Sequence, residues 1–382
     1  MTQEEKDLSF VKNVYGGKLP EIDPVYYDGA KVWEKFDKHP AMTPYVMAEI
    51  YTPEEMRMIM CLPAKPKEVA EKLGLTEEYC EKTLRHLFDM GRVSPGQRYH
   101  LETLDTFTPT YNPVTLRDHI GMAFNKFGID WATKKEMFML ADEWDIPAEG
   151  LSGLGGPDGK NVKGSRIIPK YGSIKNIPGV MPSENFKKGT VSVMRCVCKS
   201  YQNFRRYGTA NLPDGGGCES GLKERADSKN GHCLQFGQRA KFAGEHLGYF
   251  PQTIEEVDQI IAEAEDAVVI YNAKNMPEVG TICTCCNDCC PILYRLYANG
   301  IDGLAPSRFR PEVNADKCVG CKTCEKRCMF NAITFDANGK CVVDPDKCKG
   351  CGNCVIKCPT KALKMVTVHD TDWIPDIEDY IK

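Results

Sequence analysis

The chain has 382 residues, a formal net charge of -4 and 42% hydrophobic residues, which suits a globular protein of two or three domains. This charge gives no basic signature for nucleic acid, and no apolar run reaches the roughly 20 residues of a membrane-spanning helix. The first residues carry no export signal, so we expect a cytoplasmic protein. In that compartment thiols stay reduced, so the 20 cysteines favour metal ligation over disulfides.

The N-terminal part predicts an arm followed by a small helical domain. Residues 1–43 show no clear period, and we expect an arm that packs on the body. In residues 44–110, a capping box at Thr52 starts a helix, and a capped helix over Glu77–Met90 follows. Arg92–Leu101 alternates around a Pro-Gly turn, which predicts a β-hairpin. This order of helix, turn, helix and hairpin resembles a winged helix.

A winged helix prompts a DNA-binding hypothesis, but phosphate contacts need net positive charge. The candidate recognition helix carries four acidic residues against Lys82 and Arg85. We therefore favour a protein-interaction or scaffold module and regard nucleic-acid binding as the weaker alternative. Cys61 and Cys80 lie in helical patterns and are expected to be buried thiols.

Residues 111–190 predict a helical segment and then a linker rich in Gly and Pro. Residues 191–310 predict an irregular, cysteine-rich α/β domain. Within it, Thr190–Met194 and Val268–Tyr271 are expected strands, and Thr253 caps a helix with an apolar stripe. The overall expectation is an α+β protein, with residues 311–368 as a further domain and residues 369–382 as an acidic tail.

Four cysteines on expected loops form a first central set, which supplies the number of thiolates that one [4Fe-4S] cluster needs. They are Cys196, Cys198, Cys218 and Cys233. A zinc site is the alternative. His232 could replace one ligand, although an exposed loop histidine explains it more simply.

Five cysteines within eight residues form a second central set, too crowded for separate disulfides. They are Cys283, Cys285, Cys286, Cys289 and Cys290. A further metal centre built from three or four of them is the leading interpretation. A redox-active dithiol is the second, and a site that draws ligands from both central sets is the third. Catalysis in this chain would fall on Cys285, Cys286, Cys289 or Cys290.

Two copies of one cysteine pattern follow at an offset of 30 residues, each a trio in the form Cys-x-x-Cys-x-x-Cys and then a more distant cysteine. They are Cys318, Cys321, Cys324 and Cys328, and Cys348, Cys351, Cys354 and Cys358. This spacing is typical of cubane iron–sulfur clusters, whereas zinc usually takes paired knuckles. A strand is expected after each fourth cysteine, and Cys341 is expected to serve packing.

The repeat resembles the bacterial-type two-[4Fe-4S] ferredoxins. The resemblance implies two clusters, each closed by the fourth cysteine of the other run. One cluster would be held by Cys318, Cys321, Cys324 and Cys358, and the other by Cys348, Cys351, Cys354 and Cys328. Met329 stands where the family usually has Pro, so hydrogen bonding beside Cys328 is expected to differ.

The order of cysteines over residues 44–368 also resembles iron–sulfur proteins of anaerobes that have a winged-helix-like N-terminus. We therefore expect an electron-transfer protein or the electron-transfer subunit of an oxidoreductase, with a protein redox partner. Besides two ferredoxin clusters, one or two further iron–sulfur centres are expected, and zinc is less favoured. The alternatives are a reductase with its own active site at the central cysteines and a redox-sensing DNA-binding regulator. No flavin or nicotinamide fingerprint is visible.

Overall fold

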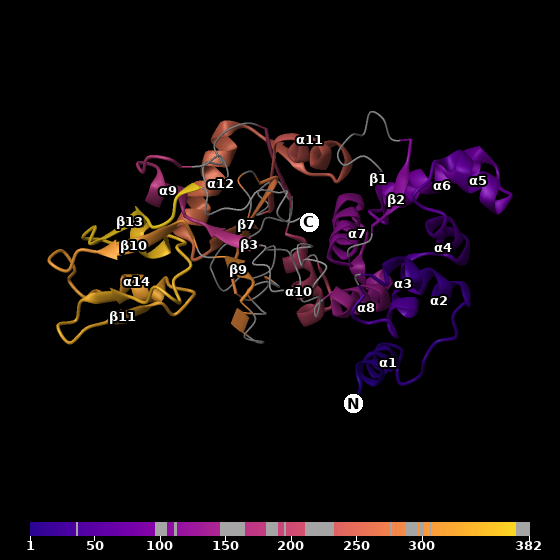
Figure 1. The fold of residues 1–382 in the computed structure, drawn as a ribbon, viewed down its shortest axis with the longest axis horizontal. Helices are drawn as coiled ribbons and strands as arrows, with labels where there is room; N and C mark the ends of the chain where they lie inside the picture. The colour runs from indigo at the N-terminus through magenta and orange to yellow at the C-terminus, as the bar shows by residue number, and fades with distance from the viewer. Residues whose placement is uncertain are drawn as a thin grey trace. The chain divides into compact units, whose positions relative to one another are not determined.

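The described part of the chain divides into two compact units. The computed structural model describes residues 1–35, 37–95, 105–110, 113–145, 165–180, 190–194, 196–210, 233–275, 277, 279–287, 290, 293, 296–297, 302–305 and 307–371. An N-terminal unit comprises residues 1–149, 197–212 and 242–249, and a C-terminal unit comprises the rest (Figure 1). Cys218, Cys289, His232 and residues 372–382 lie outside the described residues. Among the described residues, no helix has the length and apolarity to span a bilayer.

The N-terminal unit is mainly helical. Its elements are α1 (Gln3–Val14), α2 (Val25–Gly29), η1 (Ala30–Trp33), α3 (Thr43–Ile50), α4 (Pro53–Met60), α5 (Pro66–Leu73), α6 (Glu77–Asp89), β1 (Val93–Pro95), β2 (Phe107–Pro109), α7 (Pro113–Phe127), η3 (Trp131–Lys134), α8 (Lys135–Asp145) and α10 (Val197–Tyr207). The unit boundaries cross α11 (Gly237–His246). The aromatic core includes Trp131 stacked on Phe138 at 4.0 Å between ring centroids.

Sequence patterns located several of these helices and missed others. The Thr52 capping box starts α4, and Thr76 caps α6, as predicted. Residues 1–43, expected as an arm that packs on the body and without a predicted helix, contain α1, which begins with its own capping box at Thr2. The predicted turn at Pro95-Gly96 is wrong, because Pro95 lies in β1 opposite Phe107 of β2. Residues 96–101 of the predicted hairpin lie outside the described residues. The helix, turn, helix and ribbon order is present, while the winged-helix assignment stays a prediction.

The C-terminal unit is built on a seven-stranded sheet with the order β6-β4-β5-β8-β7-β3-β9. The strands are β3 (Ser165–Ile168), β4 (Val191–Met194), β5 (Cys233–Phe236), β6 (Phe250–Gln252), β7 (Ile270–Lys274), β8 (Thr281–Cys285) and β9 (Leu304–Ala305). All neighbours are antiparallel except β3 and β9. Strand β3 corrects the linker prediction for residues 165–168, since it pairs with β7 and β9 inside the sheet.

The sheet has two apolar faces because side chains alternate along each strand. On one face, α12 (Ile254–Asp266) packs through its predicted stripe against residues such as Leu234 and Ile282. On the other face, Ile167 and Ile270 pack with Phe330 of the cysteine repeat. The mixed helix and strand content confirms the α+β class, with the functional region on the second face.

The cysteine repeat forms a small module of two antiparallel strand pairs. Strand β10 (Phe309–Val313) pairs with β13 (Leu363–Thr367), and β11 (Ile333–Phe335) pairs with β12 (Cys341–Val343). One-turn helices α14 (Thr323–Lys326) and α15 (Asn353–Ile356) precede the fourth cysteine of each run. Helix α9 (Tyr171–Ile174) contributes Ile174 to a cluster with Phe309.

The backbone repeats as well as the sequence. Positive φ angles recur at the same 30-residue offset, at Gly320 (65°) and Gly350 (64°), Lys322 (59°) and Gly352 (78°), and Asn331 (51°) and Lys361 (52°). This left-handed region is uncommon for residues with a Cβ, and Asn tolerates it best. The recurrence shows that both halves follow the same chain path around their cysteines.

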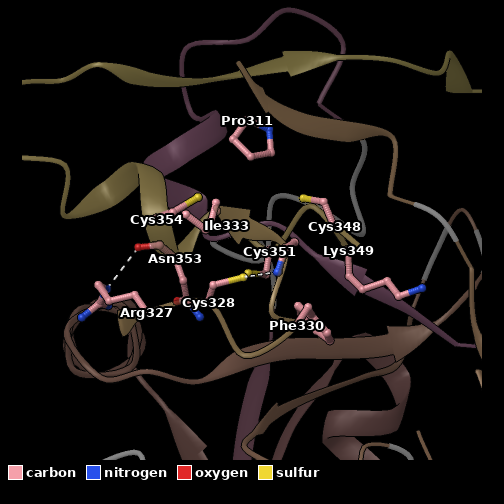
Figure 2. A pocket seen from close by; sticks show the side chains of 12 residues that line it. Pro311, Arg327, Cys328, Phe330, Ile333, Cys348, Lys349, Cys351, Asn353 and Cys354 are labelled. Carbon is pink, nitrogen blue, oxygen red and sulfur yellow. Dashed lines mark hydrogen bonds between the residues drawn. The ribbon is translucent and has the colours of Figure 1, made fainter. Parts of the chain in front are cut away.

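Arg327 joins the module to the C-terminal end of α12. Its guanidinium donates hydrogen bonds to the carbonyl oxygens of Glu265 (3.0 Å), Asp266 (3.0 Å) and Ala267 (3.2 Å). A fourth bond goes to the carbonyl of Asn353 at 3.1 Å, which Figure 2 marks with a dashed line. Carbonyls at a helix C-terminus have no partner within the helix, and a cation there also complements the helix dipole.

We predict that Arg327→Met lowers the free energy of unfolding by about 1–3 kcal/mol, because it leaves several carbonyls without a donor. The measurement is anaerobic chemical denaturation of the cluster-loaded protein. Lys347→Met is the matched control, since among the described residues the Lys347 side chain makes just the ion pair with Asp344, and its loss should cost less than about 0.5 kcal/mol. Equal losses in the two variants would contradict the anchoring role of Arg327.

Candidate metal centres

The second cysteine run and Cys328 surround one cavity, which we call site II. Cys328, Cys348, Cys351 and Cys354 line a space of about 320 Å³, together with Pro311 and Phe330. Figure 2 shows their side chains projecting into this space from the loop before α15, from α15 itself and from the segment after α14. The trio therefore meets the fourth cysteine of the other run.

The first run has an equivalent cavity, which we call site I. Cys318, Cys321, Cys324 and Cys358 line a space of about 330 Å³. Cys341, expected to serve packing, is buried in β12 and also lines this cavity, with its sulfur 3.6 Å from that of Cys324. The two cavities thus group the eight repeat cysteines in the crossed pattern that the ferredoxin resemblance implies.

Backbone N–H groups point at the cysteine sulfurs of both sites. The amide of Ala332 donates to Cys328 Sγ at 3.3 Å, and that of Ala362 donates to Cys358 Sγ at 3.2 Å. Each follows a positive-φ residue, Asn331 or Lys361, so the strained turn aims the N–H at the sulfur. Such bonds stabilise thiolate charge and raise the reduction potential of a cluster.

The sites differ in their exposure to solvent. Cys321 and Val319 are exposed, and Val319 leaves 67% of its surface open. At the corresponding positions, Cys351 and Lys349 are buried. Packing by the rest of the unit explains the difference, because a Cβ on Gly352 would lie 2.4 Å from Ser173 Oγ. One sequence motif therefore occupies two environments.

Electrostatics follow this difference. At site II, burial raises the pKa of Cys351 to about 12, so the thiolate needs iron to offset its loss of solvation. At site I, hydrogen bonding from Thr323 lowers the pKa of exposed Cys321. Beside site II, burial also lowers the pKa of Lys170 to about 7, and the Lys170 backbone N–H donates to the Cys351 carbonyl at 2.9 Å.

The central cysteines meet on the sheet face that carries the module. Cys233 on β5 lies directly opposite Cys283 on β8, and Cys285 is two residues further along β8. The Cys283 sulfur is hydrogen-bonded to both neighbours, and the Cys285 thiol also contacts Cys290. These four sulfurs form a row. Cys233, from the first central set, thus joins the second, as in the shared site that was the third alternative.

A polar frame surrounds this row. Gln235 Nε2 donates to Cys233 Sγ at 3.2 Å, while its Oε1 accepts from Arg239 Nε at 2.5 Å and from the Thr281 hydroxyl at 2.7 Å. Hydrogen bonds from Cys233 and Cys285, with the positive charge of Arg239, hold the pKa of Cys283 well below its usual range. A hydrogen bond to Cys283 and burial raise that of Cys285.

The remaining central cysteines are placed only in part. Cys286 and Cys290 are buried, Cys196 precedes α10, and Cys198 lies within α10. Within the described ranges, no three Cys, His, Asp or Glu side chains converge on a point suited to a single metal ion. In a cubane each thiolate binds a different iron, so cluster ligands are spread around a space, as at sites I and II. Cys80 is buried, as expected, whereas Cys61, also expected to be a buried thiol, is only partly buried.

Sequence patterns did not reveal the residues that frame these cysteines. Gln235, Arg239, Thr281 and Arg327 carry no motif, and their roles depend on strand register and on packing between distant segments. The alternation of Leu234 and Gln235 on β5 was the one available signal, since it places a polar side chain in a buried strand.

Two cysteine-lined cavities in a repeated framework are the mark of an iron–sulfur protein. Residues 317–362 match a family model described as the 4Fe-4S dicluster domain. No curated protein and no solved structure matches the chain. The region near the C-terminus is therefore a dicluster domain for [4Fe-4S] clusters, and an iron–sulfur electron-transfer role in general follows.

We predict that Gly350→Ala lowers iron at site II, because the new Cβ would lie 2.2 Å from the Phe309 carbonyl oxygen. Gly339→Ala is the control, since Gly339 also has a positive φ (71°) but has nothing within 4 Å. Anaerobic iron and sulfide analysis should show Gly350→Ala losing up to about four irons, and Gly339→Ala losing none. Retention of all iron in Gly350→Ala would refute a rigid wall at this site.

Proposed function

We propose that this chain is an electron-transfer protein, or the electron-transfer subunit of an oxidoreductase, with site I as its external contact and site II as its internal one. Site I would hold a [4Fe-4S] cluster through Cys318, Cys321, Cys324 and Cys358. Site II would hold another through Cys348, Cys351, Cys354 and Cys328. When bound, each cluster accepts and gives up one electron.

The difference in exposure between the two sites is the observation that supports site I as the external contact and site II as the internal one. Exposed Val319 and Cys321 bring the edge of site I to the surface, where a partner protein can approach. Lys317, Lys322 and Lys326 are exposed in the same segment, against Asp316 and Glu325. A small excess of positive charge favours an acidic redox protein as the partner.

Site II leads inward to the central cysteines. Cys351 shares an apolar cluster with Cys290 and Leu293, and Cys285 and Cys328 pack against the same cluster. Cys285 and Cys290 of the second set thus share an apolar cluster with Cys328 and Cys351, which supports a path between them and the proposed ligands of site II. An electron on the buried cluster would thus be nearest to Cys285 and Cys290, where we place the acceptor or donor site of this chain.

The other functions keep less support. A reductase active site at Cys285, Cys286, Cys289 or Cys290 fits the same relay and differs only in what accepts the electrons. A DNA-binding regulator is disfavoured by the acidic first turn of α6, where Glu77 and Glu78 stand, and by the ion pair of Arg85 with Glu81 at 3.0 Å. A mobility-shift assay in both oxidation states, with binding in neither, removes that alternative.

We predict that the anaerobically purified chain holds at least eight irons and that dithionite reduces its clusters reversibly, as followed by EPR. The variant Cys321→Ser should remove one cluster signal and Cys351→Ser the other. The proposed function would be refuted if dithionite did not reduce the clusters and if neither variant lost a cluster signal.

We also predict that a soluble iron chelator removes the site I cluster before the site II cluster, because Cys321 is exposed and Cys351 is buried. The two losses are distinguished by comparing the remaining EPR signal with those of the two cysteine variants. Loss of both clusters at one rate, or of site II first, would contradict the assignment of site I as the external contact.

A further inference from the structure

We propose that Cys233 and Cys283 form a two-electron dithiol/disulfide site that exchanges electrons with the dicluster domain. This inference rests on the proposed function and names the chemistry of the internal site. It differs from a third iron–sulfur cluster, which would need these sulfurs as iron ligands.

The strand register brings the two cysteines within bonding range. They are direct partners on adjacent antiparallel strands. Such partners have Cα atoms about 4.5–5.5 Å apart, inside the range that disulfides adopt. The side chains leave the same face of the sheet, and their sulfurs are already in hydrogen-bond contact. Oxidation therefore needs rotation of side chains and no rearrangement of the strands.

The Cys233–Cys283 pair has a buried polar neighbour on each side, Gln235 beside Cys233 and Asn272 beside Cys283. Arg239 and Thr281 fix the orientation of the Gln235 amide, which leaves its N–H directed at Cys233. On the other side, Asn272 of β7 is the register partner of Cys283. Asn272 is 5% exposed, and its Oδ1 accepts no hydrogen bond among the described residues. In the reduced pair, that oxygen can accept the S–H of Cys283 when the Cys283 side chain rotates toward β7.

Electrons and protons balance within the protein and water. Reduction breaks the Sγ–Sγ bond, consumes two electrons, and takes one proton for each sulfur that becomes a thiol. The two reduced [4Fe-4S] clusters of the dicluster domain supply one electron each, and water supplies the protons. In reverse, the dithiol loses two electrons to two oxidised clusters and the bond forms again.

The remaining sulfurs connect this site to site II. Cys285 contacts Cys283 on one side and Cys290 on the other. Cys290 packs in the apolar cluster that includes Cys351. The row thus runs from the buried cluster site to the Cys233–Cys283 pair without leaving the second face of the sheet. The two clusters, which each transfer one electron, would thereby exchange electrons with the two-electron Cys233–Cys283 couple.

The experiment uses the full cluster-loaded chain under anaerobic conditions. After mild oxidation with glutathione disulfide and blocking of free thiols, non-reducing peptide mapping should find Cys233 linked to Cys283. The link should disappear after reduction with dithionite. In a coulometric titration the wild type should take up about four electrons, two in the clusters and two in the disulfide. Cys283→Ser should take up about two while keeping all its iron.

Cys80→Ser is the matched control, because Cys80 is a buried thiol of the N-terminal unit, and it should keep all four electrons. Loss of about four irons in Cys283→Ser or Cys233→Ser would make these cysteines cluster ligands and overturn the proposal, as would an unlinked pair with an unchanged electron count. Peptide mapping tests the disulfide in the wild type, so this result does not depend on whether a variant folds. Clusters that cannot be reduced would instead refute the proposed function, so the two failures are distinguishable.

Asn272→Leu tests the acceptor. If Asn272 stabilises the reduced thiol, this variant of similar size should shift the midpoint potential of the two-electron couple to more negative values and leave the electron count unchanged. An unchanged potential would remove Asn272 from the site.

Discussion

Side-chain alternation across β7 and β8 is the constraint on which the rest of the C-terminal unit depends. Tyr271 and Ile282 face α12, whereas Ile270 and Cys285 face the cysteine module. A shift of one residue in register would exchange the two faces and bury the cysteines under α12. The apolar residues thus do two things at once: they hold the helix on one side and fix the position of the sulfurs on the other.

Internal symmetry in the dicluster domain is broken by what surrounds it. The two halves share spacing, backbone angles and N–H to sulfur bonds, so in isolation they would hold equivalent clusters. In the described part of the chain, the sheet, α9 and Lys170 pack beside site II, which includes Cys328 and Phe330 from the first half. Burial, charge and hydrogen bonding set the potential of a cluster, and here the first two differ between sites. The two halves of a duplicated sequence thereby form two cysteine sites that differ in burial and in neighbouring charge.

Much of the candidate site could be predicted from the sequence because ligand spacing is a local property. The Cys318 and Cys348 runs, the capping boxes at Thr52 and Thr253 and the stripe on α12 are set by residues within a few positions of each other. Strand β3 was not recognised, since Ser165–Ile168 is short and its partners lie over 100 residues away. The pairing of Cys233 with Cys283 was missed for the same reason: register between distant strands leaves no mark on either segment.

The strand order of the sheet has a consequence for biosynthesis. Strand β3, near the start of the unit, pairs in parallel with β9, which is made about 140 residues later, so the sheet closes only after most of the unit has left the ribosome. The dicluster domain follows directly in the sequence. Site I is lined by residues of the dicluster domain itself, whereas the wall of site II also includes Lys170 and Ser173, so site II is complete only when the domain has packed against the rest of the unit. Iron loading at site II would then depend on folding of the sheet, and loading at site I would not.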